Sequence, residues 1–204
     1  MSIDRLERQI RFIVEIDKLK SVFRQTLLMN KERYENDAEH SWHIAMMAIL
    51  LAEYAASPDV DILRVVKMLL VHDIVEIDAG DMIVYDQAGR AAQAVREQEA
   101  AKRIFNILPA DQAGEIRDLW TEFEARQTPE ALFAAALDRL QPLLHNYHTQ
   151  GAAWKKHGIT VDRVLARNQQ MAQGAPQLWE YAQAFIADAV AKGYLAKPQD
   201  PPTL

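Results

Sequence analysis

Hydrophobic residues recur every three or four positions along most of this chain. The clearest stripe lies near the N-terminus and consists of Ile3, Leu6, Ile10, Ile13 and Ile16. This spacing places the side chains on one face of an α-helix. The chain contains no succession of three strands with alternating apolar and polar positions. The pattern therefore predicts an all-α fold, a helical bundle of about seven to eight helices.

Capping residues and helix breakers indicate where the other expected helices begin and end. Asn36 and Glu39 have the spacing of a capping box. Thr128 can cap a helix whose first residue is Pro129, and Gly80 suits the end of another helix. The helices expected after the first cover about residues 38–56, 62–78, 90–108, 112–127, 128–148, 161–173 and 176–193. We expect a single domain over residues 1–196 and a mobile tail over residues 197–204.

The composition restricts the chemistry that the chain can perform. Of 204 residues, half are hydrophobic, only 7 are glycine and 8 are proline, and none is cysteine. Disulfides and thiolate ligands are therefore excluded, so a bound metal would need nitrogen and oxygen donors. The net charge is −6 and no basic run is found, which argues against a nucleic-acid partner. Small phosphorylated substrates stay possible, since a metal can supply positive charge.

No segment has the properties of a targeting or membrane sequence. The N-terminus lacks the basic and apolar regions of a signal peptide. The longest apolar run, IAMMAILLA, is stopped by Glu53 and is much shorter than the roughly 20 residues that a membrane span needs. We therefore expect a cytoplasmic protein with no membrane partner.

The stretch LLVHDIVEIDAGD, residues 69–81, contains more titratable groups than a structural helix requires. His72 and Glu76 are four residues apart, and Asp73, Asp78 and Asp81 accompany them. Residues four apart share a helix face. A His-Asp dipeptide alone is weak evidence for a metal site, because a buried histidine bonded to a backbone carbonyl is more common.

Two other segments supply groups of the same kind. His40 and His43 are three residues apart on the helix expected over 38–56. Asp138 stands in the apolar segment FAAALDRLQPLL, where a carboxylate is costly to bury unless it has a partner. The adjacent Arg139 faces another direction, because consecutive helical residues do not face each other. A metal shared with His72 and Asp73 would provide the partner.

These segments together resemble the HD-domain superfamily of metal-dependent phosphohydrolases, in the branch of the 5'-deoxynucleotidases. AEHS, HDIVEIDAGD and ALDRL match its motifs from Glu39 to Leu140. The resemblance implies one divalent metal ion (Mn, Co, Fe, Ni, Zn or Mg) held by His40, His72, Asp73 and Asp138. It also implies that Glu76 and Asp81 act on the attacking water and the leaving oxygen, and that family members are commonly homodimers.

Other residues differ from the pattern of the branch or have no role in it. The branch commonly has an Arg followed by a Trp before the first His; Arg24 can bind phosphate here, but the Trp is absent. A preference for 2'-deoxyribose is therefore not implied. We expect Trp42 in the core, His43 and His145 in supporting or packing roles, and His157 in an exposed turn.

The resemblance predicts hydrolysis of a nucleoside 5'-monophosphate, ribo or deoxy, to a nucleoside and phosphate by a metal-bound water. Two alternatives stay open. One is a nucleotide pyrophosphohydrolase or guanosine tetraphosphate hydrolase, which would need more basic residues around the mouth of the site. The other is a catalytically silent HD domain that serves as a scaffold or sensor.

Overall fold

The computed structural model describes residues 3–81 and 90–198, and helices dominate it. Eight of the described helices have eight residues or more: α1 (Ile3–Ile16), α2 (Asp37–Leu50), α3 (Ile62–Val71), α5 (Arg90–Phe105), α6 (Ala110–Ala125), α7 (Pro129–His148), α9 (Val161–Asn168) and α11 (Pro176–Ala191). The shorter ones are α4 (Glu76–Ala79), α8 (Ala152–Lys156) and α10 (Met171–Gly174), with 3-10 turns over Asp17–Ser21 and Ala52–Tyr54. The predicted helical fold is confirmed. The expected tail lies almost entirely outside the described residues.

A small sheet is present that the sequence pattern did not predict. Strands β1 (Phe23–Leu27) and β2 (Tyr34–Asn36) pair antiparallel, with Phe23 opposite Asn36 and Leu27 opposite Tyr34. The two strands are too short to show a clear alternation, which is why the periodicity does not reveal them. β2 leads directly into α2, whose capping box between Asn36 and Glu39 is formed as predicted.

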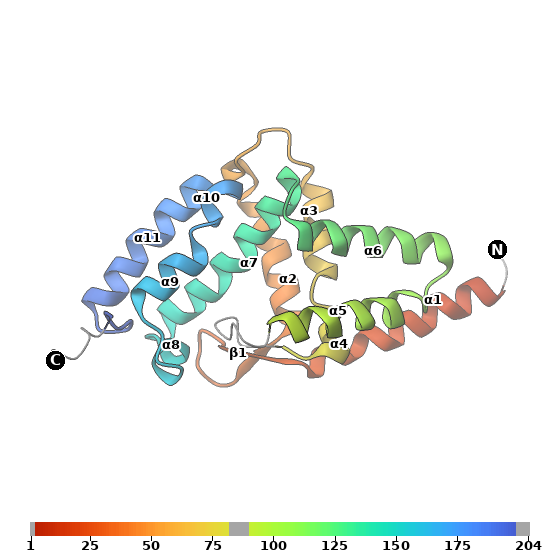
Figure 1. The fold of residues 1–204 in the computed structure, drawn as a ribbon, viewed down its shortest axis with the longest axis horizontal. Coiled ribbons are helices and arrows are strands. Elements are labelled where there is room, and N and C mark those ends of the chain that lie inside the picture. Colours follow the sequence, from red (N-terminus) through yellow and green to blue (C-terminus); the bar gives the residue numbers. More distant parts are fainter. Residues whose placement is uncertain (1–2, 82–89, 199–204) are drawn as a thin grey trace.

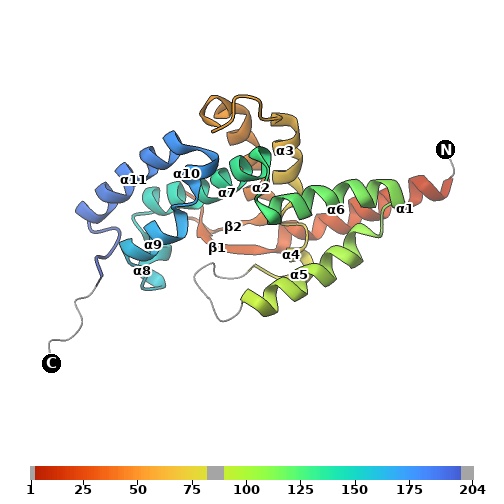
Figure 2. The ribbon, with the colours of Figure 1, turned by 45° about the horizontal axis from the view of Figure 1, so that its top comes forward.

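The helices form three groups along the molecule (Figure 1). α2, α3 and α7 lie in the middle, α1, α5 and α6 lie on the N-terminal side, and α8 to α11 lie on the C-terminal side. Figure 2 shows the β1–β2 hairpin beside the central helices. No helix within residues 3–81 and 90–198 is long and apolar enough to cross a membrane.

Two apolar clusters form the core, and the chain crosses from one to the other at the end of α3. Leu69 belongs to the cluster around α2, α3, α7 and the C-terminal helices. Val71 and Val75 belong to the cluster around α1, α5 and α6. The polar residues His72 and Asp73 therefore lie at the boundary between the two clusters, where α3 ends.

Helix α1 is attached to the domain by polar contacts and by the buried Phe12, and it leaves most of its apolar stripe exposed. Arg8 donates from Nε to the Ile107 carbonyl at 3.0 Å and from Nη2 to the Asn106 carbonyl at 2.8 Å, just beyond the end of α5. Arg5 pairs with Asp111 in the first turn of α6. Ile10 and Ile13 are 50% and 57% exposed. Most of the stripe that defines this helix in the sequence therefore does not face the domain core, and only its last member, Ile16, packs against the core.

Glycine at position 174 permits a close approach between α10 and α7. A Cβ atom there would lie 2.0 Å from the Leu132 carbonyl oxygen, which is backbone and cannot rotate away. We expect Gly174→Ala to lower the free energy of unfolding by about 1–3 kcal/mol, as other overpacked sites do. Gly114→Ala is the matched control, because nothing lies within 4 Å of its Cβ, and we expect it to stabilise α6 by about 0.5–1 kcal/mol. Urea unfolding of both variants tests this; equal stabilities would contradict it.

Candidate metal centre

The end of α3 differs from the continuous helix expected over residues 62–78. His72 N–H still bonds to the Met68 carbonyl at 2.9 Å, four residues back. Beyond it the bonds span three residues, from Ile74 to Val71 at 3.1 Å and from Glu76 to Asp73 at 2.9 Å. Helix α4 follows and ends at Gly80, whose φ of 74° suits glycine. The tighter turn brings Nε2 of His72 to 3.0 Å from Oδ1 of Asp73.

Helices α2 and α7 add the other two predicted ligands. His40, in the second turn of α2, is fully buried, and its Nε2 lies 3.1 Å from Oδ1 of Asp138 on α7. The same Asp138 oxygen is 3.8 Å from Nε2 of His72. The ring centroids of His40 and His72 are 5.6 Å apart. The buried carboxylate of Asp138 thus has His40 and His72 as the partners expected for a carboxylate in an apolar segment.

The donors present fit a divalent cation. Nδ1 of His72 lies 2.9 Å from the Leu69 carbonyl and must donate to it, so the neutral ring presents a lone pair at Nε2. That buried Nε2 faces Asp73 and Asp138 and has no hydrogen-bond partner among the described residues. A nitrogen that faces two carboxylates needs a positive charge between them, supplied by a metal ion or, in its absence, by a proton. Two imidazoles and two carboxylates form a nitrogen and oxygen set typical of divalent transition metals.

The pKa shifts of these groups also indicate that the site favours a positive charge. Burial by itself lowers the pKa of His72, but the carboxylates of Asp73 and Asp138 outweigh it and raise that pKa to about 10. Burial and the Arg24 guanidinium lower the pKa of His40 to about 4. Burial by itself raises the pKa of Asp138, but the adjacent imidazoles of His40 and His72 outweigh it and hold that pKa well below its usual value.

Arg24 of β1 is inserted into this carboxylate cluster. Its Nη1 donates to Oδ2 of Asp73 at 2.9 Å and to Oδ1 of Asp37 at 3.4 Å. The side chain is only 10% exposed, although it lines the cavity described below. The predicted phosphate-binding residue therefore lies beside the predicted ligands, held in place by two carboxylates.

Glu76 and Asp81 lie next to the same cluster. Burial and the carboxylates of Asp73, Asp37 and Asp81 raise the pKa of Glu76 well above its usual value. Burial raises the pKa of Asp81 to about 6, although Arg24 and a bond from the Gln25 backbone lower it. Raised pKa values are typical of carboxyls that exchange protons near neutral pH.

Asp37 is a member of the cluster that sequence reasoning did not identify. It is the first residue of α2, directly after the cap residue Asn36, and it is fully buried. Carboxylate oxygens of Asp37, Asp73 and Glu76 all lie within 4.8 Å of one another. Burial and the Asp73 carboxylate raise the pKa of Asp37 to about 7. The available signal was the density of acids before His40, where Glu35, Asp37 and Glu39 alternate.

A cavity of about 420 Å³ opens onto these side chains. This volume is within the range of small-molecule sites, roughly 300–1,000 Å³. The predicted site residues that line it are Arg24, His72, Asp73, Glu76, Asp81 and Asp138, and fully buried His40 lies behind them. Arg126, Trp154 and His157 also line it. His157 lies in the turn after α8, as expected, but its side chain is half-buried and not exposed.

Known proteins are similar to this chain over most of its length. Residues 16–179 match the model of the HD domain family. The protein named 5'-deoxynucleotidase HDDC2 of Mus musculus is 32% identical over 136 residues, 66% of this chain and 66% of that protein. Its namesake in Homo sapiens is also 32% identical over 136 residues, 66% of this chain and 65% of that protein. The match thus spans just under two thirds of these relatives' own length.

A solved structure extends the similarity over nearly the whole chain. It is described as a predicted metal-dependent phosphohydrolase from Magnetospirillum magnetotacticum MS-1 and is 55% identical in sequence. The superposition has a TM-score of 0.91 and covers 95% of this chain and 96% of that chain. The family model and this structure agree with the helical fold. This chain belongs to the HD domain family.

Proposed function

We propose that this protein hydrolyses nucleoside 5'-monophosphates to a nucleoside and orthophosphate, with one divalent metal ion held by His40, His72, Asp73 and Asp138. One observation carries the proposal. Two imidazole nitrogens and two carboxylates from three separate segments converge beside a buried arginine at the floor of a cavity. The relatives named 5'-deoxynucleotidase support the substrate class.

The surrounding side chains have distinct tasks in this reaction. A divalent ion at such a site lowers the pKa of water and offsets charge on phosphoryl oxygens. Arg24 faces the cavity and binds the phosphate through a guanidinium that Asp73 and Asp37 hold in position. Glu76 and Asp81 exchange protons with the attacking water and the leaving 5' oxygen, and their raised pKa values suit that work.

The sugar preference is open to a direct test. No tryptophan follows Arg24, and Leu27 or a neighbour stands in its place; Gln25 and Thr26 line the cavity. A large ring that would exclude the 2'-hydroxyl is therefore missing in this segment. We expect hydrolysis of both ribo and deoxyribo nucleoside monophosphates, with less than about tenfold discrimination, because a hydroxyl is rejected strongly only by a site built against it.

The decisive experiment is a product assay with a panel of nucleotides and divalent ions. The protein, stripped of metal with a chelator and then reloaded with single ions, should release orthophosphate alone from nucleoside monophosphates. The stripped protein is the control and should be inactive. Release of pyrophosphate from nucleoside triphosphates or guanosine tetraphosphate would replace this proposal by the alternative hydrolase. Metal binding with no turnover of any nucleotide would favour a silent scaffold.

We also propose that the protein is a homodimer that buries the exposed stripe of α1. Leu6, Ile10 and Ile13 are each at least 50% exposed, and such contiguous apolar surface is typical of an interface. The expectation that Trp42 lies in the core is wrong, because this residue of α2 is 63% exposed.

The expected result is that Ile10→Glu combined with Ile13→Glu gives a monomer in analytical ultracentrifugation, because each charge would be buried without a partner. Arg11→Glu, an exposed position beside the stripe, should leave the assembly unchanged. A wild-type protein that sediments as a monomer would contradict the dimer.

A further inference from the structure

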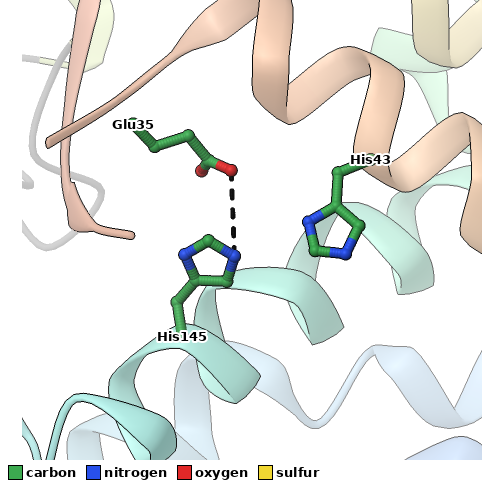
Figure 3. A group of neighbouring side chains, drawn as sticks. All are labelled: Glu35, His43 and His145. Carbon is green, nitrogen blue, oxygen red and sulfur yellow. Dashed lines mark ion pairs between the residues drawn. The ribbon is translucent and has the colours of Figure 1, made fainter. Parts of the chain in front are cut away.

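A second cluster of metal-ligand side chains lies behind the candidate metal centre. Glu35 of β2, His43 of α2 and His145 of α7 point toward one another (Figure 3), with ligand atoms within 4.8 Å. The centre of the cluster is already filled. The side-chain nitrogen of Gln141 is 2.5 Å from Oε1 of Glu35, 3.0 Å from Nε2 of His145 and 3.3 Å from Nδ1 of His43. The cluster therefore surrounds an amide group instead of a vacant cation position.

The backbone carbonyl of Leu27 determines which groups donate and which accept in these hydrogen bonds. Nδ1 of His145 lies 2.9 Å from the Leu27 carbonyl, which can only accept, so Nδ1 carries the proton. In the neutral ring, Nε2 of His145 is then an acceptor for a hydrogen from Gln141. The amide NH₂ of Gln141 must face His145 and Glu35, and its carbonyl oxygen must face the opposite way.

The amide carbonyl of Gln141 faces His40. Its Oε1 lies 3.1 Å from Nδ1 of His40 and can only accept. The proton of the neutral His40 ring is therefore on Nδ1, and the lone pair is on Nε2, the nitrogen that faces Asp138 and Asp73. A histidine needs this tautomer to bind a metal through Nε2.

We propose that Gln141 is a positioning residue that sets the tautomer and orientation of His40 before the metal binds. The hydrogen bonds run from the Leu27 carbonyl through His145 and Gln141 to His40. Gln141 is fully buried, so water does not replace it, and it lies one helical turn from Asp138 on α7. This inference rests on the proposed function, because it takes His40 as a ligand.

The first test uses the wild-type protein and needs no variant. In the metal-free protein, ¹⁵N NMR of the histidine side chains, with His40 assigned by the loss of its signals in His40→Gln, should show the proton on Nδ1. A proton on Nε2 of His40, donated to Asp138, would overturn the inference. This measurement does not depend on activity.

Two substitutions of similar size test the effect on metal binding. Gln141→Met removes the acceptor and should weaken metal affinity in calorimetry by about 10–100-fold, the usual effect of losing a partner behind a histidine ligand. Gln141→Glu keeps an acceptor for His40 and should bind metal more tightly than Gln141→Met, although burial of a second carboxylate beside Glu35 lowers its melting temperature.

The outcomes separate this inference from the proposed function. Wild-type affinity in Gln141→Met would overturn the positioning role while the metal site stands. Equal losses of affinity in both variants would show that Gln141 acts only through packing, and would also overturn it. A wild-type protein that binds no divalent ion would refute the proposed function itself.

Discussion

Replacing Asp138 by Asn should reduce metal affinity by at least about 100-fold, since loss of a mere supporting partner costs about 10–100-fold. The substitution keeps the size of the side chain and removes one negative charge. In the wild type the Asp138 carboxylate faces Nε2 of both His40 and His72. Two imidazoles and one carboxylate would then hold the ion. Hydrolysis should fall by at least the same factor at limiting metal.

The measurement is metal content together with calorimetric titration of the stripped protein. Asp118→Asn, which makes the same chemical change at an exposed position of α6, is the matched control and should bind as the wild type does. Circular dichroism checks that the helices persist. Wild-type metal content in the Asp138 variant would show that this residue is not a ligand.

Glu76→Gln should lower kcat by about 10²–10⁴-fold, the usual contribution of a general acid or base, while metal content stays unchanged. Oε2 of Glu76 is buried without a hydrogen-bond partner among the described residues, and the side chain lines the cavity. Its raised pKa follows from burial and from Asp73 and Asp37, and an amide can neither give up nor accept that proton. The Glu76 variant thus separates a loss of proton transfer, seen in kcat, from a loss of metal binding, seen in metal content.

Steady-state kinetics with the reloaded variant provide the test, with metal content measured on the same sample. Glu99→Gln, an exposed position on α5, is the control. A Glu76 variant that loses its metal would instead place Glu76 among the ligands, together with Asp37 and Asp73. A variant with wild-type kcat would remove it from the mechanism.

Local sequence signals predict the helices with strong caps and regular periodicity. The capping box of Asn36 and Glu39 and the Thr128 cap with Pro129 both form as expected. They were predictable because a cap depends on residues three positions apart. The segment expected as one helix over 161–173 is instead split into α9 and α10, and the end of α10 at Gly174 packs closely on the Leu132 backbone of α7.

Contacts between distant segments decide features that no local pattern contains. The end of α3 at Val71 places His72 and Asp73 at the boundary of two apolar clusters, although the apolar spacing continues past it. The apolar residues of α1 recur with the period of a helix, but this periodicity does not reveal which face of the helix packs against the domain. Arg5 and Arg8 attach α1 to α5 and α6 through its other face.

The sequence by itself determines the helical fold class and, through its motifs, the seven residues expected at the site. Those residues stand in four short segments whose order and chemistry are visible in the chain. Only the tertiary structure brings Asp37 to Glu76 and Gln141 to His40, because these pairs are separated by many residues along the chain. Their importance depends on burial, which makes an unpaired carboxyl or a misplaced proton costly. Burial is a property of the packed molecule and not of any one segment.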